Sequence, residues 1–240
     1  MKRAFAIICT FMLSLGSINA LAQQSYPDEA FVYQLDSVVT YTGNAPKITD
    51  FLVAFLNQDE TSEVLWSLDQ AWNHYLLGEP QEPCVQFMVD EKNGYLRYTY
   101  NSKWCSDCED FDELFYYELC YWNCSDGKHK IIAENIVSLD EDMYYLGQYS
   151  GTMFHIYDNA THKLYSTDDE LLGSYVEPII DETDCETGEP MTKHDETIAV
   201  YHLPQQGKDI TVDIYRGTKK KTGIRLEWDG MRFHRQDKDQ

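Results

Sequence analysis

The sequence is poor in positive charge and has no long hydrophobic run beyond its first 22 residues. Its 240 residues include 19 lysines and arginines against 41 aspartates and glutamates, a formal net charge of −22. A chain this acidic repels phosphate backbones and anionic lipid surfaces, so nucleic-acid binding is disfavoured. No later segment is apolar for long enough to span a bilayer, so we expect no membrane insertion of the mature chain.

The sequence also lacks the short motifs of several enzyme classes. Neither G-x-S-x-G nor H-E-x-x-H occurs, and there is no phosphate-binding glycine loop. His155 and His162 flank a predicted hairpin turn without a recognisable catalytic partner, so we expect strand or surface roles for them. The acidic clusters at 140–143, 168–170 and 181–189 lack the spacing of a calcium-binding loop, and solubility is the simpler role. No cofactor or metal is predicted.

The first 22 residues have the layout of a secretory signal peptide. Lys2 and Arg3 precede an apolar run, and Ala20-Leu21-Ala22 forms a small-x-small cleavage site. Cleavage after Ala22 leaves 17 basic against 41 acidic residues, a net charge of −24. We therefore expect a periplasmic or secreted protein. Residues 23–240 are predicted to form a single α+β domain, in which an acidic, aperiodic stretch at 173–195 can act as a seam.

Two amphipathic helices are predicted near the start of the mature chain. Thr49 can cap a first helix through FLVAFLNQ. The second, SEVLWSLDQAWNHYLLGEP, ends at Gly78 and Pro80. Its residues at helical spacing form one apolar stripe made of Val64, Leu65, Leu68, Ala71, Trp72, Tyr75 and Leu76.

After residue 83 the hydrophobic period changes from helical to alternating. Turn signals occur at Asn93-Gly94 and at 125–127, and again at Gly217 and 229–230. Strands joined by such short turns are antiparallel. The sequence therefore predicts an α+β fold, with an N-terminal helical pair packed on a mainly antiparallel β-sheet and a β-rich C-terminal half.

Six cysteines follow the predicted cleavage site, an even number that favours disulfides in an exported protein. They are Cys84, Cys105, Cys108, Cys120, Cys124 and Cys185. Trp104-Cys105-x-x-Cys108 resembles the W-C-x-x-C of thioredoxin-like proteins, but the preceding segment alternates like a half-exposed antiparallel strand. Zinc is disfavoured because Cys120 and Cys124 lie about 13 Å apart along one strand face. We expect disulfides that fix the loop between two adjacent strands, with their connectivity left open.

Aromatic residues are abundant, with 18 tyrosines and 5 tryptophans. Alternation in LFYYELCYWN places Tyr116 and Trp122 on one strand face, and the other face is aromatic as well. Exposed rings on a sheet can stack on a ligand, so Tyr116 and Trp122 are candidates for a binding surface. Ordinary sheet packing is the alternative, and we expect at least one face to lie on the core.

The segments ELCYWNCSDGKHKIIAENI, FLVAFLNQ, AWNHYLLG and LEWDGMRF resemble a group of exported Bacteroidetes proteins of unknown function. This resemblance implies an envelope or secreted location and brings no catalytic residues; the Cys105/Cys108 pair is not a feature of the group. The expected function is a non-enzymatic module that binds a protein or a glycan. The alternatives are a hydrolase with unassigned carboxylates and a thiol-disulfide oxidoreductase using the W-C-x-x-C at 104–108.

Overall fold

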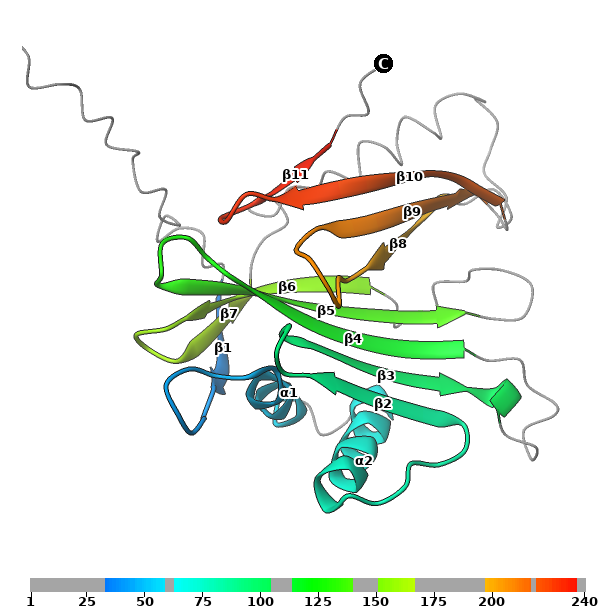
Figure 1. Ribbon diagram of the computed structural model, residues 1–240, viewed down its shortest axis with the longest axis horizontal. Helices are drawn as coiled ribbons and strands as arrows, with labels where there is room; N and C mark the ends of the chain where they lie inside the picture. Colours follow the sequence, from blue (N-terminus) through cyan, green and yellow to red (C-terminus); the bar gives the residue numbers. More distant parts are fainter. Residues whose placement is uncertain are drawn as a thin grey trace, which may run out of the picture.

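The computed structural model describes residues 33–58, 63–104, 114–139, 151–166, 197–216 and 219–236. These residues form three layers, with two helices below a large sheet and a smaller sheet above it (Figure 1). The elements in chain order are β1 (Tyr33–Val38), α1 (Ile48–Leu56), α2 (Glu63–Leu77), β2 (Val85–Asp90), β3 (Tyr95–Asn101), a 3-10 turn (Ser102–Trp104), β4 (Leu114–Asn123), β5 (His129–Leu139), β6 (Gly151–Asp158), β7 (Lys163–Ser166), β8 (Thr197–His202), β9 (Ile210–Arg216), β10 (Lys219–Trp228) and β11 (Phe233–Arg235).

The large sheet has seven antiparallel strands in the order β1-β7-β6-β5-β4-β3-β2. Strands β2 to β7 follow one another as a meander, and β1 forms the edge of the sheet beside β7. The predicted hairpin at Asn93-Gly94 is confirmed, since β2 pairs with β3 and Gly94 has a φ of 65°. The hairpin at 125–127 is confirmed in the same way by the pairing of β4 with β5.

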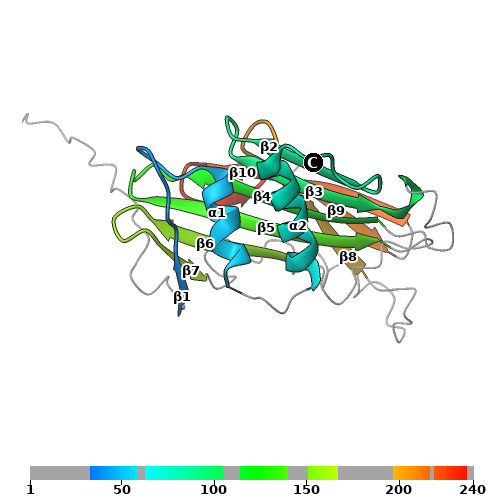
Figure 2. The same ribbon diagram turned by 90° about the horizontal axis from the view of Figure 1, so that it is seen from below.

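Both predicted helices are present and lie across one face of the large sheet (Figure 2). The predicted cap of α1 is wrong: the N-cap is Lys47, whose backbone N–H donates to Asp50 Oδ2 at 2.8 Å. Thr49 lies inside the helix, where its hydroxyl donates to Glu91 Oε1 at 2.7 Å. The carboxylate of Asp50, the third helical residue, thus satisfies the N–H group of the N-cap residue, which has no partner within the helix.

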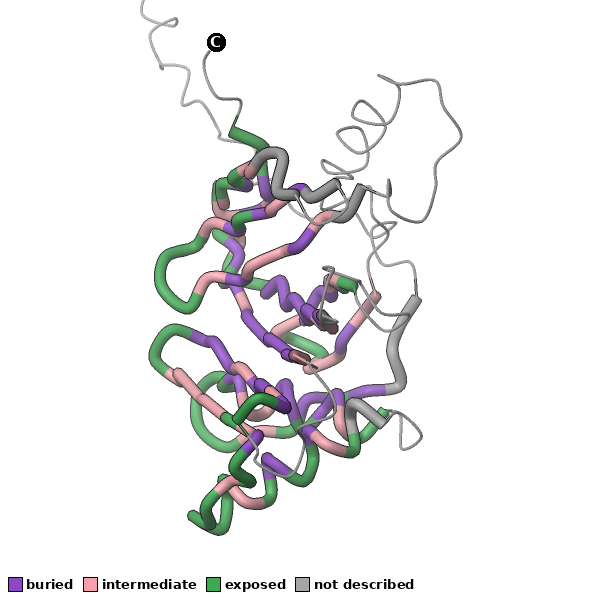
Figure 3. The backbone as a smooth tube through the Cα atoms, turned by 90° about the vertical axis from the view of Figure 1, so that its right-hand side faces the viewer, coloured by how far each residue is buried: buried purple, intermediate pink, exposed green. Residues whose placement is uncertain are grey.

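The large sheet is buried on both faces, which gives the protein two cores. The helix-side core includes Phe51, Leu52, Leu68 and Tyr117, and the core on the other face includes Trp122. Buried segments concentrate where the layers meet, whereas turns are exposed (Figure 3). Alternation along β4 therefore places apolar and aromatic side chains in one core or the other.

The strands after residue 197 do not extend the first sheet. They form a separate antiparallel sheet in the order β11-β10-β9-β8, which packs on the face opposite the helices. The prediction of strands with a turn at 229–230 is confirmed, but a single sheet was expected and two are present. Hydrogen bonds join the two sheets, since Trp122 Nε1 donates to the carbonyl of Lys208 at 2.8 Å.

Several predictions fall outside the described residues. They concern the signal peptide at 1–22, the seam at 173–195, the acidic clusters at 140–143, 168–170 and 181–189, and Cys105, Cys108 and Cys185. Within the described ranges, neither helix has the length and apolar character needed to cross a bilayer.

Candidate functional site

Tyr116 and Trp122 do not form an exposed binding surface, so this expectation needs correction. They are only 5% and 4% exposed. The indole of Trp122 packs edge to face on Phe233 with ring centroids 5.0 Å apart, and the guanidinium of Arg97 lies 4.4 Å from the ring centroid of Tyr116. The second sheet covers this face of β4 at Trp122, which is why the indole packs inward instead of meeting a ligand.

Cys84, Cys120 and Cys124 are all buried, and no disulfide joins any two of them. Cys120 does not form the expected disulfide. Its free thiol donates to the carbonyl of Pro204 at 3.6 Å. Burial, with the nearby Glu118 carboxylate, raises the pKa of the Cys120 thiol well above its usual range. A thiol of this kind is a packing residue and not a nucleophile near neutral pH.

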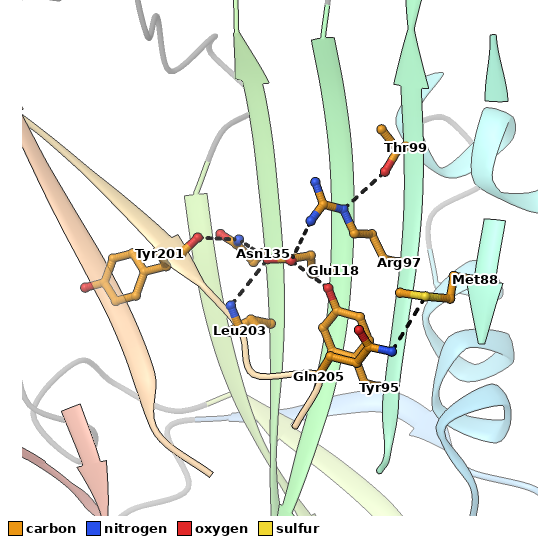
Figure 4. Close-up of polar contacts among 9 residues, drawn as sticks. All are labelled: Met88, Tyr95, Arg97, Thr99, Glu118, Asn135, Tyr201, Leu203 and Gln205. Atoms are coloured by element: carbon orange, nitrogen blue, oxygen red, sulfur yellow. Dashed lines mark hydrogen bonds and ion pairs between the residues drawn. The ribbon is translucent and has the colours of Figure 1, made fainter. Parts of the chain in front are cut away.

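A buried carboxylate, Glu118 on β4, connects the two sheets (Figure 4). Its oxygens accept hydrogen bonds from the Tyr95 hydroxyl at 2.7 Å and from Asn135 Nδ2 at 2.8 Å. The backbone N–H of Leu203, just after β8, donates to it at 3.4 Å, and Arg97 Nη1 lies 3.5 Å away. Four donors therefore surround one carboxylate.

Asn135 links this cluster further across the sheets. Its amide also donates to the carbonyl of Tyr201 at 2.9 Å, and its Oδ1 accepts from the Thr152 hydroxyl at 2.9 Å. The threonine thus fixes the orientation of the amide, whose two N–H groups point to Glu118 and Tyr201. The arrangement serves to hold β8 against β4 and β5.

A second buried carboxylate, Glu134 on β5, faces the helices. It accepts from the Tyr117 hydroxyl at 2.7 Å, and His155 Nε2 lies 2.8 Å from it. His155 is 6% exposed and packs on Phe55 with ring centroids 4.9 Å apart. Its Nδ1 is buried and has no hydrogen-bond partner among the residues that the structure describes. The expected strand role for His155 agrees with its place on β6, where the pair with Glu134 holds it in the core.

The two buried carboxylates do not converge on one point. In the ladder between β4 and β5, Glu118 pairs with Asn135 and Leu119 pairs with Glu134, so the two carboxylates lie on opposite faces of the sheet. Each is enclosed by its own donors from the protein. They can orient and stabilise the layers, but they do not form the facing carboxylate pair that acid–base hydrolysis uses.

The hydroxyls bound to these carboxylates should make the protein sensitive to alkali. Burial, with Glu118 for Tyr95 and Glu134 for Tyr117, raises the pKa of both tyrosines far above the usual value. In the unfolded chain the two tyrosines ionise near pH 10. The stability that their protonated hydroxyls give the folded state is therefore complete below that pH and declines above it. Each tyrosine should steepen the fall in unfolding free energy by about 1.4 kcal/mol per pH unit.

Urea unfolding between pH 9 and 11 measures this decline. Tyr117→Phe removes one of the two ionising groups, so its unfolding free energy should fall less steeply with pH than that of the wild type. Equal slopes for the two proteins would contradict the assignment.

An open groove lies between α2 and the β2–β3 edge of the large sheet. It has a volume of about 270 Å³. Helix α2 contributes one wall, the segment after it and the two strands contribute the rest, and β2 is the last strand of the sheet. The lining residues are Trp66, Ser67, Gln70, Ala71, His74, Gln81, Glu82, Val85, Tyr98 and Tyr100.

The groove combines aromatic rings with polar groups. Trp66 is 62% exposed at its rim, whereas Tyr98 is buried. His74 Nδ1 lies 3.0 Å from the carbonyl of Pro80, and a carbonyl only accepts, so Nδ1 is the donor of this pair and Nε2 is an acceptor in the tautomer that leaves it without a proton. The amide of Gln81 donates to the carbonyl of Ala71 at 3.0 Å. Within the described part of the chain, the side chain of Gln70 has no hydrogen-bond partner.

Sequence reasoning did not single out these residues as a site. One signal was available, since Trp66 lies on the polar side of α2, opposite the stripe that buries Leu68, Ala71 and Trp72. A tryptophan on the polar side of an amphipathic helix has no packing role in the core beneath it. The tyrosines of β3 gave no such signal, because their position beside α2 depends on tertiary packing.

Comparison with known proteins adds no assignment. A scan against protein-family models, a search of curated proteins and a search of solved structures each find no match to this chain. Among the described residues, no three histidine, cysteine, aspartate or glutamate side chains are grouped closely enough to hold a metal ion. The groove is therefore the candidate site on its geometry alone.

Proposed function

We propose that this protein is an exported, non-enzymatic binding module whose ligand occupies the groove between α2 and β2–β3. One observation carries the proposal: Trp66 is 62% exposed at the rim of a groove of about 270 Å³. Tryptophan is the side chain that most often dominates binding energy when it anchors a ligand. A concave site with aromatic walls and a few polar groups is also typical of ligand recognition.

The arrangement of the buried acids supports binding over hydrolysis. Glu118 and Glu134 lie on opposite faces of the sheet, are enclosed by their own donors, and neither of them lines the groove. Among the described residues that line the groove, Glu82 is the one carboxylate and His74 is the one histidine. They do not include the nucleophile, base and orienting acid that a hydrolytic triad needs. The groove can therefore bind a ligand, but its described residues do not form a set of catalytic side chains that would hydrolyse it.

Removing the Trp66 ring should weaken ligand binding. Ligands are first identified by screening the purified protein on panels of immobilised peptides and oligosaccharides. Trp66→Ala should then reduce affinity for any groove ligand about tenfold or more, the loss expected for a tryptophan hot spot. Leu77→Ala is the matched control, since Leu77 is 71% exposed on the same helix but does not line the groove. Equal effects of the two substitutions would rule out the groove as the site.

The exported location has its own test. If Ala20-Leu21-Ala22 is the cleavage site, the mature chain should begin at Gln23 and accumulate outside the cytoplasm. Intact-mass measurement on protein from cell fractions checks both points. A chain that retains residues 1–22 in the cytoplasmic fraction would contradict export.

A further inference from the structure

The groove has an electrostatic character that narrows the class of its ligand. We propose that it takes the cationic side chain of a lysine or arginine from a protein partner, an inference that rests on the binding function proposed above. Among the residues that the structure describes, no lysine or arginine lines the groove, whereas Glu82 contributes a carboxylate. The whole chain carries a net charge of −22, which attracts a basic partner before contact.

Glu82 and His74 give the groove acceptors for a cationic ligand. Glu82 is exposed and presents its carboxylate, and the weak thiol donor of Cys84 lies 3.9 Å from Oε2. His74 Nε2 is an acceptor in the neutral ring because Nδ1 donates to Pro80. An ammonium or guanidinium group is a pure donor, so it matches this set. Ser67 and Gln70 also line the groove and can donate, so the preference for a cation rests on the Glu82 carboxylate and the aromatic rings.

The aromatic residues suit the same kind of ligand. Trp66, Tyr98 and Tyr100 all line the groove, and aromatic rings attract cations through the negative charge density of their faces. Tryptophan is the strongest of the three ring types in this interaction. The exposed Trp66 ring and the Glu82 carboxylate therefore favour a cationic group over a neutral apolar one.

The position of the groove favours a side chain on an extended segment. Val85 lines it and is the first residue of β2, the edge strand of the sheet. An extended peptide can run beside an edge strand while one of its side chains enters an adjacent pocket. A volume of about 270 Å³ accommodates a single long side chain, in keeping with this mode.

A pair of matched peptides tests the proposal on the full mature chain at physiological salt. The first is a short acetylated and amidated peptide with one central lysine between glycines, and the second replaces lysine with norleucine. Binding is followed by the chemical shift of the Trp66 indole N–H. We expect the lysine peptide to bind about tenfold more tightly than its norleucine counterpart, because only the first has a charge for Glu82 and the rings.

Two substitutions separate the site from general attraction to an acidic surface. Glu82→Gln should weaken lysine-peptide binding several-fold and leave the norleucine peptide unchanged. Glu79→Gln removes the same charge from an exposed residue that does not line the groove, so it should have little effect. An equal loss in both variants would overturn the proposal, because binding would then depend on net charge.

The remaining outcomes distinguish this inference from the proposed function. Equal binding of the two peptides at Trp66 would overturn the cation preference while leaving the groove as a binding site. A shift of the Trp66 signal with a neutral oligosaccharide but not with the lysine peptide would also overturn the cation preference and leave the groove as a binding site. If neither peptides nor oligosaccharides move the Trp66 signal, the cationic ligand and the groove function both fail.

Discussion

Replacing Glu118 with alanine should lower the free energy of unfolding by about 3–5 kcal/mol. The substitution leaves the Tyr95 hydroxyl, the Asn135 amide and the Leu203 N–H without their shared acceptor inside the protein. Each buried donor without a partner costs about 1–3 kcal/mol. Arg97 adds little to this loss, because its side chain is 36% exposed and can be hydrated again.

Denaturant unfolding at neutral pH measures the effect. Glu118→Gln should lose less than Glu118→Ala, since the amide keeps one acceptor oxygen but places an N–H₂ group among donors. Glu227→Ala removes an exposed glutamate on β10 and should change stability by about 0.5 kcal/mol or less. A Glu118→Ala loss as small as that of the control would show that the carboxylate does not hold the two sheets together.

Replacing Gly94 with alanine should destabilise the protein by about 2–4 kcal/mol, which combines two costs. Gly94 has a φ of 65°, a conformation that L-residues with a side chain adopt at a cost of about 1–2 kcal/mol. A Cβ at this position would also lie 2.7 Å from Cε1 of Tyr121. The ring cannot easily retreat, because it packs on Phe51 at 5.6 Å and lies under Lys130 Nζ at 4.9 Å.

The chain contains a matched control for the backbone cost alone. Gly127 has a φ of 68° in the next hairpin, and a Cβ there would meet nothing within 4 Å. Gly127→Ala should therefore lose only the conformational part, about 1–2 kcal/mol. The difference between the two variants in unfolding free energy measures the clash with Tyr121. Equal losses would show that Tyr121 moves aside at no cost.

Features that depend on neighbouring residues were predictable from the sequence. The Asn-Gly turn at 93–94 and the glycine at 127 fix hairpins through the backbone conformation that glycine permits. The stripe of α2 was predicted by helical spacing and buries Leu68, Ala71 and Trp72. The point at which this stripe ceases to be buried was not predicted, since Leu76 belongs to the stripe but is 60% exposed. Spacing identifies a helix face but does not show how far the sheet beneath it extends.

Features that depend on distant residues were not predictable. Strand β1 pairs with β7, more than a hundred residues later, and residues 33–38 alone carry no sign of that partner. The division into two sheets, which buries Trp122, likewise depends on how β8 to β11 fold back over β4. The groove has the same origin, because Trp66 and Tyr100 meet only when α2 docks beside β3.

The claim that the groove is the ligand site has a direct test in the tryptophans. The chain has five, and labelling with 5-fluorotryptophan gives each a separate ¹⁹F resonance, with Trp66 assigned through Trp66→Phe. We expect titration with the lysine peptide or a neutral trisaccharide to move the Trp66 resonance in a saturable way and leave buried Trp122 unchanged. Saturable binding that moves other tryptophans while Trp66 stays fixed would contradict the account.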